Sequence, residues 1–178
     1  MSGHNKWAQI KHKKAITDAK KSKIFSKLVR YISVEAKLSE GKDSPGLRAV
    51  IEKAKRVNMP SENIERAIKK ASEPSAQMEK IIYETYGPGG VGIIIETLTD
   101  NRNRTAQEIK HILSKNSFTL AGMGSVSWAF EQENTPEGLM WKPTTTLPLS
   151  NTELELLEKL IDELEENDDI QDVYTNAK

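Results

Sequence analysis

The chain contains 178 residues, of which 37% are hydrophobic and 29% charged, and it has no cysteine. That length suits one or two domains with packed cores, and the lack of cysteine excludes disulfide scaffolds, thiolate metal sites and cysteine nucleophiles. No apolar run approaches the roughly 20 residues of a membrane-spanning helix, and Lys and His occupy the N-terminus where a secretory signal would be apolar. We therefore expect a soluble cytoplasmic protein with no membrane partner.

The formal net charge is zero, yet the two signs are segregated along the chain. Residues 1–70 hold 18 Lys and Arg against 7 Asp and Glu, whereas residues 71–178 hold 8 against 19. The first 30 residues contain nine cations and a single acid, Asp18, while residues 150–178 contain ten acids and two lysines. Such a separation indicates that one half of the chain faces a polyanion.

The first half reads as an arm followed by three helices. Residues 1–16 are polar, with isolated apolar positions, and predict an arm. From residue 17 to about 40, apolar residues recur at helical spacing on one stripe and Lys and Arg gather on the other side. Gly41 ends this helix. Ser44-Pro45 begins a second one, and the break at 58–60 separates it from a short third helix, so the three can bury one another's stripes.

The second half changes to β-rich sequence after a linker at 72–78. The runs 79–86 and 91–99 predict a hairpin through Gly87-Pro88-Gly89-Gly90. The elements expected after it are a helix over 103–116, a strand in which Val126, Trp128 and Phe130 alternate, a loop at 132–138, an extended segment over 139–149, a helix opened by the Ser150 capping box, and a strand over 170–175. This β-β-α-β-β-α-β order predicts an antiparallel sheet with helices on one face.

These patterns predict an α+β protein with two domains. Residues 1–76 are expected to form a basic, nucleic-acid-binding three-helix domain. Residues 77–178 are expected to form an acidic α+β domain with an antiparallel sheet of the ferredoxin-like type.

The cationic face of the first helix, with the arm before it, is the leading candidate site. Phosphate binding needs mobile positive charges spaced along a surface, and lysine supplies them without reading base sequence. An ordinary solvated face is the alternative, but such a face normally mixes signs, and Asp18 is the only acid before Glu35. The predicted phosphate contacts are Lys6, Lys11, Lys13, Lys14, Lys20, Lys23, Lys27 and Arg30.

Three further arm residues are candidates for contact with RNA. His4 and His12 either reach phosphate or lie exposed on the surface. Neither is expected to bind metal, because no cysteine or nearby carboxylate completes a ligand set, and no cofactor is expected. Trp7, set among cations, either stacks on a base or anchors the arm on the helical domain.

The second half offers weaker candidates. Arg102 and Arg104 lie near the start of a helix and are candidates for a secondary anion contact; capping and pairing with Asp100 is the alternative. The glycine-rich run 87–92 lacks the Lys-Ser/Thr of a phosphate-binding loop and joins two strands, so it predicts a tight turn. No spacing of nucleophile and base points to an enzyme.

Several segments resemble the YebC/PmpR family, whose mitochondrial relative is the translational activator of cytochrome c oxidase. The opening Ser-Gly-His-Asn-Lys-Trp-Ala-Gln-Ile-Lys-His-Lys-Lys is similar to the start of that family. The segments that carry the resemblance, in the family's order and over most of the chain, are Ser2–Leu28, Asn58–Lys70, Tyr86–Gly92, Thr99–Thr105, Gly122–Phe130 and Asp172–Ala177.

The resemblance implies a helical N-terminal domain, α+β domains and a non-enzymatic role in gene expression. It also implies nucleic-acid contacts at the family-matched residues Asn58, Met59 and Arg66. The family usually carries another α/β domain before the segment that begins here at Trp141, whereas this chain has only residues 131–140 there, so a short form with two domains is expected. With Met1 directly before the family motif, we expect no mitochondrial presequence.

Three functions stay open at this point. The first is a ribosome-associated translation factor that docks its basic domain on ribosomal RNA and relieves stalls at proline-rich stretches, one of the two descriptions of the family. The second is a DNA-binding transcriptional regulator, although no helix-turn-helix pattern stands out and lysine suits backbone contact better than base readout. The third is a protein-interaction module with a basic docking face. In the first, the acidic domain would meet a basic protein or orient the complex by repulsion.

Overall fold

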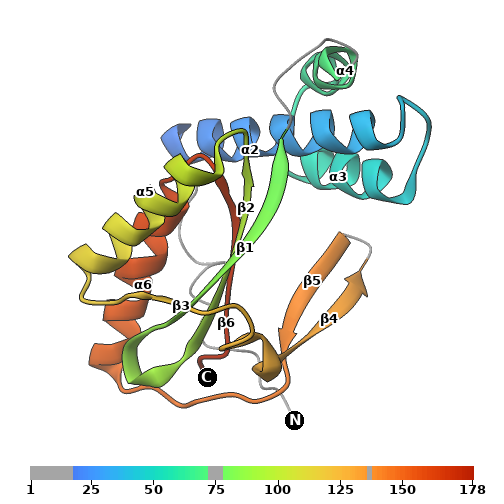
Figure 1. Ribbon diagram of the computed structural model, residues 1–178. Coiled ribbons are helices and arrows are strands. Elements are labelled where there is room, and N and C mark those ends of the chain that lie inside the picture. The colour runs from blue at the N-terminus through green and yellow to red at the C-terminus, as the bar shows by residue number, and fades with distance from the viewer. Residues whose placement is uncertain (1–17, 72–77, 136–137) are drawn as a thin grey trace. The chain divides into compact units, whose positions relative to one another are not determined.

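The computed structural model describes residues 18–71, 78–135 and 138–178 (Figure 1). The chain divides into two compact units. The first, the helical unit, contains the described residues up to Glu79 together with 133–140, and the second, the sheet unit, contains 80–132 and 141–178. The fold class is α+β, as predicted. Among the described residues no helix is long and apolar enough to cross a membrane, and no group of three or more His, Asp or Glu is placed to hold a metal ion.

The helical unit contains α2 (Asp18–Leu38), α3 (Pro45–Arg56) and α4 (Ser61–Lys70), which confirms the three predicted helices. Their apolar stripes meet in one core, and the hydroxyl of Ser33 on α2 donates to the carbonyl of Ala67 on α4 at 3.0 Å. The buried members of this core are Leu28, Ile32, Ala36, Leu47, Ala54, Met59, Ile64 and Ala67. Burial of these stripes stabilises helices that would be marginal alone.

Helices α2 and α3 end in the same way. The second residue after each helix has positive φ, 52° at Glu40 and 60° at Asn58. The next N–H then donates back across the last turn, from Gly41 to a carbonyl five residues earlier at 2.8 Å and from Met59 to Ala54 at 3.0 Å. This pattern satisfies carbonyls that the helix itself leaves open. The predicted helix ends near Gly41 and at 58–60 are confirmed.

The sheet unit is built on a four-stranded sheet with the order β3-β1-β2-β6. The strands are β1 (Glu79–Tyr86), β2 (Gly92–Thr99), β3 (Leu120–Ala121) and β6 (Ile170–Thr175). Helices α5 (Arg102–Lys115) and α6 (Asn151–Glu165) lie on the same side of this sheet (Figure 1). Strands β2 and β6 pair antiparallel, with Ile94 opposite Tyr174. The chain order β1-β2-α5-β3-α6-β6 is not the β-α-β-β-α-β order of a ferredoxin-like domain.

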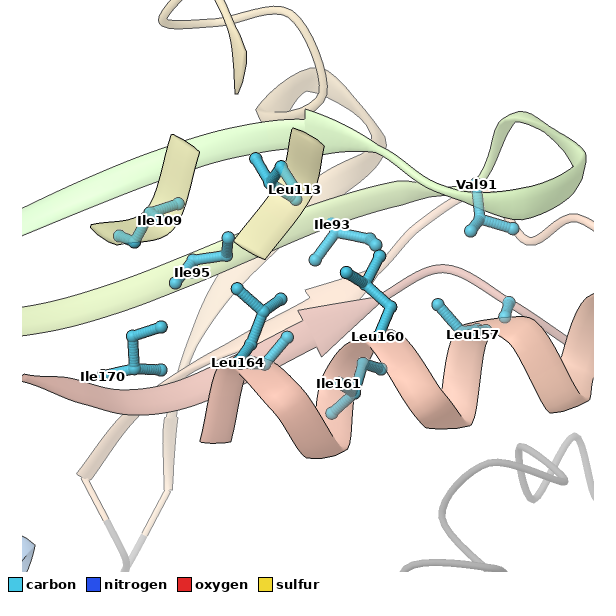
Figure 2. Packing of buried hydrophobic residues seen from close by; sticks show 12 residues of the cluster. Val91, Ile93, Ile95, Ile109, Leu113, Leu157, Leu160, Ile161, Leu164 and Ile170 are labelled. Carbon is cyan, nitrogen blue, oxygen red and sulfur yellow. The ribbon is translucent and has the colours of Figure 1, made fainter. Parts of the chain in front are cut away.

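Strand β2 is buried on both faces, which explains its continuous apolar run. Ile93 and Ile95 point into the core beneath the two helices (Figure 2). Ile94 points to the opposite face, where it packs with Val126 and Phe130. The helices contribute Ile109 and Leu113 from α5 and Leu157, Leu160, Ile161 and Leu164 from α6. This core positions everything else in the unit.

The glycine-rich connection between β1 and β2 is a turn, as predicted. Residues Pro88–Gly90 form a single 3₁₀ turn, η1. Gly89 has a φ of 64°, and a Cβ there would displace the end of the Leu149 side chain. The backbone conformation therefore favours glycine at this position. The glycines allow this turn between two strands, whereas a phosphate-binding loop would lead from a strand into a helix.

The strand prediction around Trp128 was wrong. Residues Ser127–Ala129 form a 3₁₀ turn, η2, and the Trp128 side chain is 68% exposed. The following strands, β4 (Phe130–Thr135) and β5 (Gly138–Pro143), pair only with each other in a separate two-stranded sheet. The predicted loop at 132–138 was too long, because β4 continues to Thr135, and the extended segment expected over 139–149 is a strand only as far as Pro143. Alternating apolar residues are compatible with a strand and also with a turn between two buried residues. Their spacing alone therefore did not distinguish a strand from a turn.

Candidate nucleic-acid interface

The cation stripe of α2 is the described part of the predicted interface. Lys20, Lys23, Lys27 and Arg30 recur at intervals of three and four, so their Cβ atoms share one face of the helix. The opposite face carries Ile32, which is fully buried. Lys23 is exposed and Lys27 and Arg30 are partly exposed, whereas the side chain of Lys20 lies outside the described side chains. The buried stripe thus fixes the direction in which the cations project.

The arm that carries the remaining predicted contacts lies outside the described residues. Those contacts are His4, Lys6, Trp7, Lys11, His12, Lys13 and Lys14. Their roles stay predictions.

Two cations of α3 pair with acids close to them in the sequence. Arg48 contacts Asp43 at 3.4 Å, and Lys55 donates to Glu52 at 3.0 Å. All four side chains are more than half exposed, so these pairs add little stability, but they reduce the local positive field. On α2, the segment 20–30 contains cations and no acid, and Asp18 and Glu35 lie outside it. In the sequence, α2 therefore carries the longest run of one charge sign among the described helices.

Of the three residues implied by the resemblance, two have structural explanations. Met59 is 5% exposed and belongs to the core of the helical unit, which gives its side chain a packing role, and its contact with nucleic acid stays a prediction. Asn58 is exposed, but its positive φ is a conformation that favours Asn and Gly, and this gives it a role in ending α3. Arg66 is exposed on α4 and stays a predicted contact.

Arg104 is held by carboxylates of its own unit. One guanidinium nitrogen contacts Asp169 at 2.8 Å and Asp100 at 2.9 Å. Hydrogen bonds to Asp169 first and then Asp100 raise the pKa of Arg104 above its usual range. This geometry matches the alternative of local pairing, and a secondary anion contact at Arg104 stays a prediction. Arg102 is exposed and stays a prediction.

Asp169 is the centre of a buried polar cluster that the sequence did not reveal. Its carboxylate, 4% exposed, accepts hydrogen bonds from Thr105 at 2.7 Å and Thr99 at 3.2 Å as well as from Arg104. Thr99 also accepts from the backbone N–H of Asn101 at 2.9 Å. The cluster joins the end of β2, the start of α5 and the turn before β6. The Thr99–Thr105 motif thus has a structural role.

Glu84 is a second buried carboxylate that was not anticipated. It is 5% exposed and accepts backbone hydrogen bonds from Gly124 at 2.8 Å, Val126 at 2.7 Å and Ser127 at 3.0 Å. Burial opposes ionisation, but these donors outweigh it and hold the pKa of Glu84 below its ordinary value. On sequence alone Glu84 is one more charge in a strand. Its partners lie about 40 residues away, which no local pattern indicates.

Comparison with known proteins identifies the family. The description "TACO1/YebC protein N-terminal domain" matches residues 5–74, and "TACO1/YebC second and third domain" matches 78–137 and 132–177. The chain belongs to the TACO1/YebC family. The second description matches in two pieces that meet at 132–137, where the sequence predicted a missing domain.

The relatives extend this result. A probable transcriptional regulatory protein of Fervidobacterium nodosum is 41% identical over 235 aligned positions, covering 99% of this chain and 93% of the relative. Another of that name from Thermotoga petrophila is 54% identical, over 77% of this chain and 56% of the relative. A conserved hypothetical protein of Aquifex aeolicus has a solved structure with a TM-score of 0.83 and 34% identity, covering 98% and 97% of the two chains. The first alignment is longer than this chain, so the relative carries a segment that this member of the TACO1/YebC family lacks.

Proposed function

We propose that this TACO1/YebC family member is a non-enzymatic, nucleic-acid-binding regulator of gene expression. The observation that carries the proposal is the cation stripe of α2, where Lys23, Lys27 and Arg30 project opposite a buried core. The names of the relatives as probable transcriptional regulatory proteins support a role in regulation.

The charge arrangement favours binding to a phosphate backbone. Lysines spaced along a helix contact phosphates without reading bases, and each contact releases a counterion. If all eight predicted cations of the arm and α2 contact phosphates, the affinity falls with salt at a log–log slope of roughly −6 to −7. A slope of that size is a quantitative signature of the proposed interface.

The described helices favour RNA over duplex DNA as the polyanion. Helices α3 and α4 are joined by residues 57–60, a connection as short as that of a helix-turn-helix. The exposed face of α4, however, carries Glu62 and Glu65 in its N-terminal half, followed by Arg66 and Lys69. If α4 were a recognition helix in the major groove of DNA, these two glutamates would be repelled by the phosphates on either side of the groove, and binding would be weaker. We therefore place ribosomal RNA first, with relief of stalls at proline-rich stretches as the proposed activity.

A DNA-binding transcriptional regulator is the second candidate. The names of the curated relatives favour it. In that case the same cations of α2 would lie along the backbone of a duplex, and specificity would come from residues outside this stripe.

The test measures binding of the full chain to purified ribosomes, to a ribosomal RNA fragment and to duplex DNA over a salt series. The test variant is Lys23→Glu with Lys27→Glu on α2. Its control is Lys110→Glu with Lys178→Glu in the sheet unit, which changes the net charge equally at two exposed positions. We expect the α2 variant to lose about tenfold to a hundredfold in affinity and to show a slope shallower by about 1.4 to 1.8. The control should change affinity less than about threefold.

The outcomes separate the two candidates. Binding to ribosomes that depends on α2, with weaker binding to DNA, supports the translation factor. Dependence on α2 for a duplex alone favours the transcriptional regulator. Equal losses in the α2 variant and its control would contradict an interface on α2, because only the overall charge would then matter.

A further inference from the structure

The sheet unit exposes an apolar surface that the proposed nucleic-acid interface does not use. Three large side chains of neighbouring segments form it: Tyr86 at the end of β1 is 46% exposed, Met123 is 95% exposed and Trp128 on η2 is 68% exposed. We call these three residues the aromatic loop surface. Large exposed apolar groups that gather in one place indicate an interaction site.

Hydrogen bonds hold the two rings of this surface in place. The hydroxyl of Tyr86 donates to the carbonyl of Ser125 at 2.6 Å, and the indole N–H of Trp128 donates to that same carbonyl at 2.8 Å. Both polar groups are thereby satisfied within the loop, and the apolar parts of the rings remain toward solvent. A partner thus meets aromatic groups that are already ordered, which lowers the entropic cost of binding.

The loop beneath the rings is fixed from inside the domain. The buried carboxylate of Glu84 accepts three of its backbone N–H groups, including that of Gly124, whose φ is 85°. A buried anion with three donors is a strong constraint on loop conformation. The exposed residues therefore sit on a rigid support that extends into the sheet through β1.

The charge of the segment that carries this surface, and of the half of the chain to which it belongs, indicates the chemistry of the partner. The run from Ser117 to Phe130 contains no Asp, Glu, Lys, Arg or His, so it offers no cation to a phosphate. Interface cores between proteins are likewise depleted in charge and enriched in Trp, Tyr and Met. Exposed Glu131 follows the run directly, and residues 71–178 carry 19 acids against 8 cations. A protein with basic residues around an apolar patch complements both features.

We propose that the aromatic loop surface docks a protein whose apolar contact patch is bordered by lysine and arginine. This inference does not depend on which nucleic acid the helical unit binds, because the segment 117–130, which carries Met123 and Trp128, contains no cation. It assigns to Trp128 the central contact, with Met123 as an adaptable neighbour.

The test uses short random peptides displayed on phage and selected on the immobilised full chain. A synthetic copy of the selected peptide is then titrated against the protein and its variants by fluorescence anisotropy. We expect selected sequences with aromatic or aliphatic anchors beside Lys or Arg. Trp128→Ala should weaken their binding at least tenfold, whereas Trp128→Phe, which keeps an aromatic ring, should weaken it less. Leu156→Ala on α6 is the control, since Leu156 is also an exposed apolar residue, at 51%.

Several results would overturn the proposal. These are selection of acidic peptides, selection of none, or equal effects of the Trp128 and Leu156 variants. Loss of self-association in Trp128→Ala, seen by sedimentation, would identify a second copy of the chain as the occupant. Weaker RNA binding by Trp128→Ala would identify a base-stacking platform. Because unaltered RNA binding is expected for Trp128→Ala, failure of the α2 interface and failure of this surface are distinguishable.

Discussion

The helical unit and the sheet unit place their charged groups in opposite ways. On α2, the apolar face packs into the core of the helical unit, and the cations lie on the other face, where Lys23 is exposed. In the sheet unit, Glu84 and Asp169 are buried at 5% and 4% exposure, and each accepts at least three hydrogen bonds. One unit presents charge to solvent, and the other uses charge to fix loops and strand ends.

The exposed cations of the helical unit and the buried carboxylates of the sheet unit are therefore expected to affect different properties, nucleic-acid binding and folding stability respectively. Exposed cations contribute little to folding, but they act on a polyanion over a distance that salt sets. Buried carboxylates act over hydrogen-bond distances and respond to pH instead. We therefore expect salt to change the binding of nucleic acid, and we expect core substitutions and acid to change the stability of the sheet unit.

The largest effect is expected from the core of the sheet unit. Leu160 on α6 is fully buried against the sheet (Figure 2), so Leu160→Ala removes apolar contacts and leaves a cavity. We expect it to lower the free energy of unfolding by about 2–5 kcal/mol, measured by urea denaturation. The neighbouring control Leu156→Ala, at a half-exposed position, should cost less than about 1 kcal/mol. A small loss at Leu160 would show that this core repacks.

An intermediate effect is expected at Glu84. Glu84→Gln replaces an anion by an amide whose NH₂ faces backbone donors, and we expect it to cost about 2 kcal/mol. Because the pKa of Glu84 is lowered on folding, the unfolded chain takes up a proton first as the pH falls. The contribution of this carboxylate is therefore complete above the ordinary value of 4.5 and disappears as the pH falls through the folded value.

Urea denaturation at a series of pH values measures that contribution. The stability difference between the wild type and Glu84→Gln should shrink as the pH falls below 4.5. Glu155→Gln, at an exposed position of α6, provides the control and should leave the stability profile close to that of the wild type. A difference that stays constant down to acid pH would contradict an ionised Glu84 in the folded state.

Local patterns in the sequence were sufficient for most of the helices and for the central strands. The stripe of α2, the Ser44-Pro45 start of α3 and the capping box at Ser150 all act within a few residues, and each was confirmed. The two-residue strand β3 has no periodicity to detect. It exists because Glu84 and Thr85 of β1 pair with it from far along the chain.

The candidate site shows the same limit. The sequence indicated which residues of α2 share a face, because helical spacing alone decides that. It did not reveal that Met59 lies in the core or that Asp169 holds Arg104, because both depend on partners brought together by folding. Burial also explains the wrong prediction at Trp128. The spacing of Val126, Trp128 and Phe130 predicted a strand, but Val126 and Phe130 are buried whereas Trp128 is exposed.

The smallest effect, and the sharpest test of the helical unit, is expected at Asn58. If Asn58 serves to end α3 at its φ of 60°, Asn58→Gly should leave the free energy of unfolding within about 0.5 kcal/mol, because glycine adopts this conformation freely but also gains entropy in the unfolded chain. Asn58→Ala removes the same amide and should cost about 1–2 kcal/mol, since a Cβ disfavours positive φ. RNA affinity, measured where each variant is folded, should then change less than about twofold in both. A matching loss of affinity in the two variants, beyond about fivefold, would instead show that the Asn58 amide contacts nucleic acid, since glycine preserves the helix end and still lacks the amide.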